Sequence, residues 1–270
     1  MLVTEPRPSG SGLCLLLLAA LSFASTLRAD APIYSADSLV NSADNQSGWL
    51  APNAIATLYG RNLAYGTKTL SSDDIRGGVL PTVLPDTGVR VLVNGLPANP
   101  YYVSPTQINF LIPPNLLPGP STVQLIIDGL AGPQISVALA AAAPALYQLD
   151  PQNIIATRPD GSLITPATSA KPGDVVVLYA TGLGPAVPPV GYGDLPRSAA
   201  PLEMLTDFFV LLDGNAVDPS AIAYAGIAPG FAGLYQINLI LPNSTGSNPE
   251  IRIGIADAVG KSGLHIPVSP

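Results

Sequence analysis

The sequence predicts an all-β protein, with two immunoglobulin-like β-sandwiches in tandem behind a signal peptide. Lys and Glu, which usually cover the exposed faces of helices, occur only three times each in 270 residues. Pro (30) and Gly (26) are abundant and indicate many turns. Apolar residues make up 47% and charged residues 11%, so the chain can bury a core and does not have the composition of a disordered segment.

The N-terminus predicts export. Residues 13–21 (LCLLLLAAL) form a short apolar run, and Ser22-Phe23-Ala24 fits the small-x-small cleavage pattern. We therefore expect a signal peptide over residues 1–24 and an exported mature chain that starts at Ser25. The apolar run is too short to cross a bilayer, and no later stretch is long enough, so we expect no membrane span in the mature chain. Cys14, the only cysteine, falls in this segment, so the mature chain would hold no disulfide and no Cys nucleophile.

An internal repeat organises the rest of the chain. Residues 52–64 (PNAIATLYGRNLA) are answered by residues 172–184 (PGDVVVLYATGLG), with the Leu-Tyr pair in register. Further along, residues 107–113 (QINFLIP) are answered by residues 236–242 (QINLILP). These spacings are the size of a domain rather than of a solenoid repeat. We therefore expect one sandwich over residues 33–143 and a second over residues 144–270.

Each unit contains short alternating runs of apolar residues bounded by turn residues, the pattern of sandwich strands. The first alternating pattern, VRVLVNG, and its counterpart FVLLDG both close on a hairpin turn signal. The alanine-rich segment 138–145 favours a helix by propensity, but its β-rich flank and Pro144 indicate a last strand and a linker. The expected strands are 55–59, 89–93, 107–112, 123–127 and 135–139 in the first unit, and 154–157, 162–165, 175–179, 208–212, 235–241, 251–255 and 264–268 in the second.

Five motifs carry a resemblance to a known family. They are 50–64 (LAPNAIATLYGRNLA), 102–109 (YVSPTQIN), 160–165 (DGSLIT), 179–185 (YATGLGP) and 226–238 (GIAPGFAGLYQIN). On these motifs the chain resembles the Solibacter-type C-terminal domain family of secreted acidobacterial proteins, which are paired immunoglobulin-like units akin to IPT/TIG domains. Asn53 and the segment 84–88 (LPDTG) depart from the family's usual glycine turns. The resemblance implies a secreted or surface location and offers no catalytic residues to transfer.

Charge and residue types exclude several function classes. The net charge of −7 and the pI of about 4.4 argue against nucleic acid or an anionic membrane surface as partner. His265 is the only histidine, which leaves no zinc site or Ser-His-Asp triad, and we interpret it as a bonded strand residue. We expect no cofactor and no metal, since no calcium-loop motif is present. Two carboxylate pairs, Asp73 with Asp74 and Asp213 with Asp218, remain formal candidates for glycosidase chemistry.

Two Gln-x-Asn pairs are the first candidate ligand contacts. Gln107 with Asn109, and Gln236 with Asn238, are spaced so that both amides of a pair lie on the same face of a strand. The favoured interpretation is structural, with the amides satisfying backbone groups of the preceding turn. The alternative is a ligand site shared by both units.

Aromatic side chains are the second group of candidates. Trp49 and the tyrosines Tyr34, Tyr101, Tyr102 and Tyr192 could stack on a sugar ring, although packing in the core or an interface is favoured for Trp49. Because Tyr101 and Tyr102 are adjacent on a strand, we expect at most one of them to face solvent. Tyr192, between Gly191 and Gly193, is the best candidate for an exposed aromatic contact. The sequence thus predicts a non-enzymatic exported adhesion or scaffold module that binds a surface protein or a polysaccharide. The alternative is a carbohydrate-binding module that uses exposed aromatics and loop amides, and an enzyme of unrecognised type is a third possibility.

Overall fold

The computed structural model describes residues 30–269, so the expected signal peptide over residues 1–24 and Cys14 lie outside the described residues. The described chain is all-β as the sequence predicts: it contains no α-helix, and its helical turns are four short 3₁₀ segments. No helix in this part is long and apolar enough to cross a membrane. Residues Ala31–Pro270 form one compact unit. The 3₁₀ segments are η1 (Ala36–Ser38), η2 (Ser72–Asp74), η3 (Leu205–Asp207) and η4 (Pro219–Ala221).

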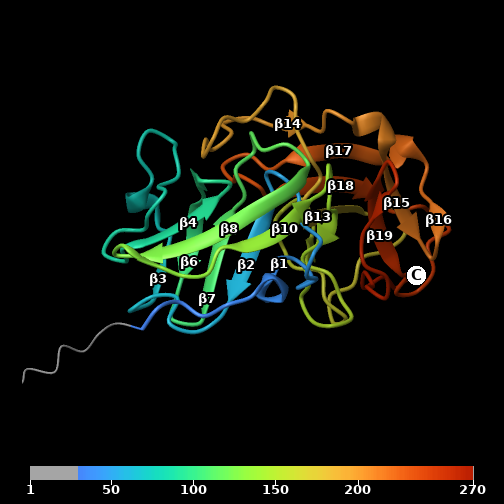
Figure 1. Cartoon of the computed structure of the whole chain (residues 1–270). Helices are drawn as coiled ribbons and strands as arrows, with labels where there is room; N and C mark the ends of the chain where they lie inside the picture. Colours follow the sequence, from blue (N-terminus) through green and yellow to red (C-terminus); the bar gives the residue numbers. More distant parts are fainter. Residues whose placement is uncertain (1–29, 270) are drawn as a thin grey trace, which may run out of the picture. The chain divides into compact units, whose positions relative to one another are not determined.

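The first half forms two antiparallel sheets that enclose one hydrophobic core. In Figure 1 its blue-to-green strands gather on one side and the yellow-to-red strands of the second half on the other. The first sheet has the order β1 (Leu39–Asn41), β2 (Ile55–Tyr59), β7 (Gln107–Leu111), β6 (Asn99–Val103), β3 (Lys68–Thr69). The second has the order β10 (Ile135–Leu139), β8 (Gly119–Ile127), β4 (Val89–Val93), β5 (Leu96–Pro97), with β9 (Leu130–Ala131) beside β8.

The second half repeats this arrangement around its own core. Its larger sheet has the order β11 (Ala145–Leu146), β13 (Val175–Thr181), β18 (Tyr235–Ile240), β17 (Ile222–Ile227), β14 (Ala200–Pro201), with β12 (Ala156–Thr157) beside β13. The smaller sheet has the order β16 (Asn215–Ala216), β15 (Phe208–Leu212), β19 (Ile251–Ile255), β20 (Ala258–Val259). The alanine-rich segment is the end of β10 and a linker, as expected.

Alternation along the strands builds both cores. Val89, Val91 and Val93 of β4 point inward and are buried, while Arg90 between them is exposed. These valines pack in one buried cluster with side chains of the opposite sheet, such as Phe110 of β7. Burying an aliphatic side chain of this kind stabilises the fold by about 1.5–3 kcal/mol. The buried residues of one core lie between residues 34 and 139, and those of the other lie between residues 146 and 268. The predicted boundary between residues 143 and 144 falls in the interval that separates the two cores.

The two halves pair their central strands in the same register. Tyr59 of β2 lies opposite Gln107 of β7, and Tyr179 of β13 lies opposite Gln236 of β18. The next strand in each sheet, β6 or β17, carries a register shift one step before a tyrosine that lies opposite the Asn of the pair. The Gln-x-Asn motifs therefore occupy the same place in both sheets.

Two expected strands are wrong, and the two longest of the strands that the sequence analysis does not predict are β6 and β17. Residues 264–268 are buried apart from half-buried His265, but the segment changes bonding partner along its length and makes only isolated bridges. Residues 162–165 make a single bridge, because the hairpin after the turn at Gly161 is too short for a ladder. The strands β6 and β17 were missed because Pro100, Gly226 and several alanines lower strand propensity there. Pro100 is tolerated because it lies at the register shift.

Buried hydrogen bonds join the two sandwiches. The amide of Ile55 donates to Thr181 Oγ1 (2.9 Å), and Thr181 donates in turn to the carbonyl of Gly233 (2.7 Å). Asn53 Nδ2 donates to the hydroxyl of Tyr235 (2.9 Å), a residue with no exposed surface. Buried polar groups of this kind are satisfied only in one relative placement, so they fix how the sandwiches meet.

The linker is bonded to both sides. Asn41 Nδ2 of the first sandwich donates to the carbonyl of Ala143 (3.2 Å). The amide of Ala143 donates to the carbonyl of Gly182 in the second sandwich (2.8 Å). Gly182 has a φ of +79°, and a Cβ there would lie 2.1 Å from the carbonyl oxygen of Ala143. Only glycine allows this close approach.

Candidate functional site

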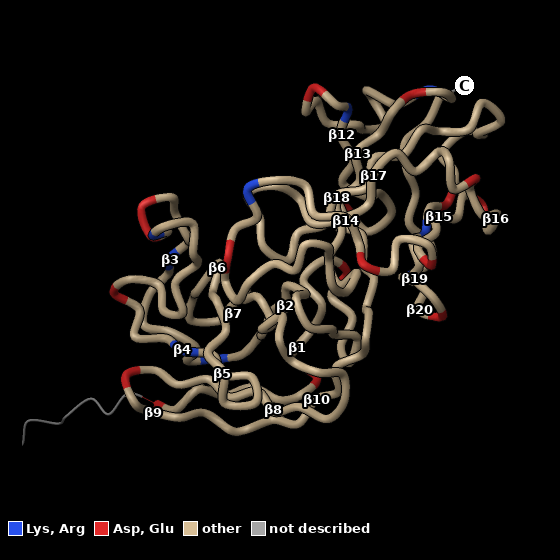
Figure 2. The backbone as a smooth tube through the Cα atoms, turned by 90° about the horizontal axis from the view of Figure 1, so that it is seen from above, with Lys and Arg blue, Asp and Glu red and all other residues tan. Residues whose placement is uncertain are grey.

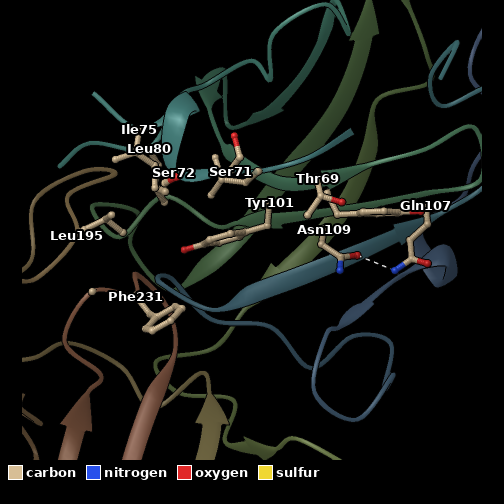
Figure 3. A pocket seen from close by; sticks show the side chains of 13 residues that line it. Thr69, Ser71, Ser72, Ile75, Leu80, Tyr101, Gln107, Asn109, Leu195 and Phe231 are labelled. Atoms are coloured by element: carbon tan, nitrogen blue, oxygen red, sulfur yellow. Dashed lines mark hydrogen bonds between the residues drawn. The ribbon is translucent and has the colours of Figure 1, made fainter. Parts of the chain in front are cut away.

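A groove of about 640 Å³ lies where the two sandwiches meet, within the size range of small-molecule sites. Its wall comes from the outer face of the first sheet, from the segment around η2, and from two loops of the second sandwich. Figure 3 shows Tyr101 drawn between the amide pair of β7 and Phe231 of the second sandwich. The lining residues are Thr69, Leu70, Ser71, Ser72, Ile75, Leu80, Tyr101, Tyr102, Gln107, Asn109, Leu195, Gly230 and Phe231.

Phe231 stands on a loop that backbone bonds hold in place. The loop connects β17 to β18 and is closed by the amide of Ala228 on the carbonyl of Leu234 (2.9 Å). The amide of Gly230 donates to the carbonyl of Pro196 (2.7 Å). On the other side of Phe231, the carbonyl of Ala232 accepts the Tyr101 hydroxyl (2.6 Å). The phenyl ring is nevertheless 55% exposed, so a fixed backbone presents an open aromatic face.

The β6 strand supplies two tyrosines to the groove. Both are half-buried, and the register shift after Pro100 allows adjacent residues to reach the same groove. Tyr101 uses its hydroxyl across the joint, and burial raises the pKa of Tyr101 well above its ordinary value. Tyr102 makes no side-chain hydrogen bond within the described part of the chain. Its hydroxyl is thus left for solvent or a ligand.

Each Gln-x-Asn pair is bonded to itself. Gln107 Nε2 donates to Asn109 Oδ1 (2.9 Å), and Gln236 Nε2 donates to Asn238 Oδ1 (2.8 Å). The expectation that these amides satisfy the preceding turn is wrong, because in the first sandwich Ser104 Oγ accepts and donates there instead. The amides of an i and i+2 pair are close enough on an open sheet face to bond each other. Only the first pair lines the groove.

An apolar cluster closes the other end of the groove. Leu80 and Leu111 of the first sandwich are buried against Ala232 of the second, and Ile75 and Leu195 pack around them. Leu111 extends the outward face of β7 beyond Gln107 and Asn109. The outer face of the sheet is therefore polar at one end and apolar where the second sandwich covers it.

Tyr192 and Trp49 lie outside the groove. The expectation that Tyr192 is exposed is wrong: it is half-buried, and its hydroxyl is buried without a hydrogen-bond partner. Its loop packs on the first sandwich, since the amide of Leu80 donates to the carbonyl of Gly193 (2.8 Å). Trp49 is half-buried in a separate hollow between the linker and the β19–β20 turn, with Met204 in its lining. This place fits the interface packing favoured for it.

Three of the four candidate carboxylates accept backbone amides. Asp74 Oδ2 accepts the amide and hydroxyl of Ser71, which lowers the pKa of Asp74, and Lys68 lies 3.4 Å away. Asp218 accepts the amide and hydroxyl of Ser220, which lowers its pKa as well. Asp213 Oδ1 accepts the amide of Glu250 (2.9 Å). A general acid needs a raised pKa, which is the opposite of what Asp74 and Asp218 have.

His265 and the acidic residues form no metal centre in the described residues. His265 Nδ1 bonds the carbonyl of Asn248 (2.9 Å) on a half-buried strand-like segment. No cluster of three or more His, Cys, Asp or Glu side chains occurs within residues 30–269.

Comparisons with solved structures find weak matches to proteins of cell surfaces. One match is a surface glycan-binding protein from a mixed-linkage glucan utilization locus of Bacteroides ovatus, in complex with a mixed-linkage heptasaccharide. It is 13% identical with a TM-score of 0.31, and the match covers 82% of this chain and 43% of that one. The surface glycan-binding protein of Prevotella bryantii is 10% identical (TM-score 0.27; 86% and 41% covered). Domains 5–6 of the S-layer protein SbsC are 10% identical (TM-score 0.26; 88% and 98% covered).

The chain spans less than half the length of either glycan-binding protein. At these TM-scores the matches carry no argument about what this chain binds. No protein-family model matches the chain, and no curated protein matches it. The family resemblance therefore stays a prediction.

The sequence indicates part of the groove. Gln107 and Asn109 are predicted ligand contacts, and Tyr101 and Tyr102 are among the aromatic candidates, but Phe231 is not singled out by the sequence. The available signal for Phe231 was its place between Gly230 and Gly233, where an aromatic residue in a tight loop has little core to enter.

Proposed function

We propose that this chain is an exported, non-enzymatic adhesion or scaffold module whose ligand site is the groove between its sandwiches. The supporting observation is the lining of the groove, which gathers aromatic rings from both sandwiches and side-chain amides from the first. Among the described lining residues there is no carboxylate, imidazole or thiol to act as acid, base or activated nucleophile. Such a surface suits binding without chemistry. The hydrogen-bonded joint supports a scaffold role, since it keeps the groove's two walls in place.

The test is binding by the purified mature chain, residues 25–270. It is presented to a panel of cell-wall polysaccharides and used in parallel to capture proteins from the cell envelope. Saturable binding without turnover of the ligand is expected. Hydrolysis of a panel member that is lost on Asp73→Asn or Asp213→Asn would show an enzyme and refute the proposal.

A carbohydrate-binding module is the second candidate, and one observation favours it. The amide pair of Gln107 and Asn109 lies in the same groove as exposed Phe231, which places polar and apolar contacts for one ligand side by side. We also propose membership of the Solibacter-type family, on the five motifs that carry the resemblance.

A further inference from the structure

Phe231 combines an exposed side chain with a backbone that hydrogen bonds hold in place. Bonds to the backbone of residues 230, 232 and 233 come from Pro196, Tyr101 and Thr181, so the loop is fixed on either side of the ring. Association normally costs the ordering of loops and side chains at the site. A loop that is already ordered avoids that cost. The ring thus offers a flat apolar contact at low entropic cost.

The amide pair leaves one donor and one acceptor free. Gln107 Nε2 and Thr57 Oγ1 both donate to Asn109 Oδ1 (2.9 and 3.1 Å). These bonds orient both amides, so that Asn109 Nδ2 and Gln107 Oε1 have no protein partner within the described residues. A donor beside an acceptor complements hydroxyl groups, because each hydroxyl both donates and accepts.

Charge excludes ionic ligands from this site. No residue that lines the groove within the described chain carries a charged side chain. Asp74, at the end of η2, is already bonded to Ser71 and lies beside Lys68. The protein as a whole carries a net charge of −7, and its charged residues lie mainly in loops (Figure 2). An anionic ligand would be repelled without a compensating contact, so the ligand that fits is neutral.

We infer that the groove binds a neutral oligosaccharide segment of a polysaccharide. The apolar C–H face of a sugar ring packs on Phe231, and ring hydroxyls bond Asn109 Nδ2 and Gln107 Oε1. The inference rests on the proposed binding function and adds the ligand class and the residues that recognise it. Because Phe231 belongs to one sandwich and the amide pair to the other, the site exists only when both sandwiches are joined.

The chain provides its own control for the amide pair. Gln236 and Asn238 have the same internal bond and lie in the same register, but they lie outside the groove and line no described pocket with Phe231. Tyr65, which is 62% exposed, is the matching control for an exposed aromatic ring. Loss of a general surface property would affect both members of each matched set equally.

The experiment measures affinity by calorimetry for cellohexaose, laminarihexaose, xylohexaose, mannohexaose and the anionic hexagalacturonate. At least one neutral oligosaccharide is expected to bind saturably, and its affinity should be nearly constant between about 50 and about 500 mM NaCl. Phe231→Ala and Asn109→Ala should each weaken binding about tenfold or more. Tyr65→Ala and Asn238→Ala should leave it within about twofold.

Three results overturn the inference: binding of hexagalacturonate alone, no binding of any neutral member, or affinity unchanged in the Phe231→Ala/Asn109→Ala double variant. If these occur while the chain still captures an envelope protein, the proposed function stands and only the ligand class fails. If a neutral oligosaccharide binds at the groove and is also cleaved, the ligand class stands and the non-enzymatic function fails. Circular dichroism of each variant confirms that it is folded.

Discussion

Replacing Tyr235 by Phe should weaken the joint between the sandwiches without changing the shape of the core. The Tyr235 hydroxyl accepts from Asn53 Nδ2 and donates to the carbonyl of Gly184, and the side chain has no exposed surface. Removing one oxygen leaves two buried polar groups without this partner, each at a cost of about 1–3 kcal/mol. We expect the free energy of unfolding to fall by about 2–6 kcal/mol, the sum for the two groups. For a chain of this size that lowers Tm by about 4 °C or more.

Urea unfolding followed by circular dichroism measures this change, and differential scanning calorimetry gives Tm. Tyr102→Phe is the control, because the Tyr102 hydroxyl has no hydrogen-bond partner within the described chain; its stability should stay within about 0.5 kcal/mol of wild type. A loss below about 0.5 kcal/mol in Tyr235→Phe would refute the reasoning that this hydroxyl satisfies the joint.

Three further predictions concern the joint and buried ionisable groups. Gly182→Ala should lower the free energy of unfolding in urea by about 3 kcal/mol or more, because the new Cβ would lie 2.1 Å from the carbonyl oxygen of Ala143. Gly161 has a φ of +85° but open space around it, so Gly161→Ala should lower it by only about 1 kcal/mol. Equal losses in the two variants would exclude the steric cause. Burial raises the pKa of Tyr147 to about 12, so the folded protein keeps a proton that the unfolded chain loses above pH 10. The stability that this group contributes is complete below pH 10 and is lost as pH rises toward 12, by about 1.4 kcal/mol per pH unit. The free energy of unfolding of Tyr147→Phe should therefore fall less steeply than that of wild type over this pH range. An identical fall in the two proteins would contradict this prediction. Burial likewise raises the pKa of Asp44, whose Oδ2 has no hydrogen-bond partner among the described residues. Asp44→Asn should therefore stabilise the protein at pH 7, but not below about pH 4, where Asp44 is protonated in both the folded and the unfolded state. Thermal unfolding at the two pH values tests this.

Strands with a strict period of two could be predicted from the sequence. The 89–93, 135–139 and 208–212 strands have the predicted limits because each places apolar residues on one face, and burial of that face decides the structure. The strand β6 could not be recognised in this way. Pro100 and two adjacent tyrosines break its alternation, and the register shift lets both tyrosines reach the same groove.

The candidate site was harder to predict because it depends on contacts between the two halves. Periodicity places Gln107 and Asn109 on one face, but it does not show that Phe231 lies across a groove from them. Tyr192 failed for the same reason: flanking glycines indicate a turn, whereas contact of that turn with Leu80 buries the ring in part. Long-range packing of loops is not encoded in local residue patterns.

The two halves differ in one connection that has a consequence for how such proteins can diversify. In the first sandwich, residues 104–106 connect β6 to β7; in the second, residues 228–234 connect β17 to β18 and carry Phe231. The strand pairing around both connections is the same, with a tyrosine opposite the Asn of each Gln-x-Asn pair. Substitutions at position 231 therefore alter a surface that neither core depends on. A lineage of such proteins can acquire new specificities by substitution at this one exposed position while every strand keeps its neighbours.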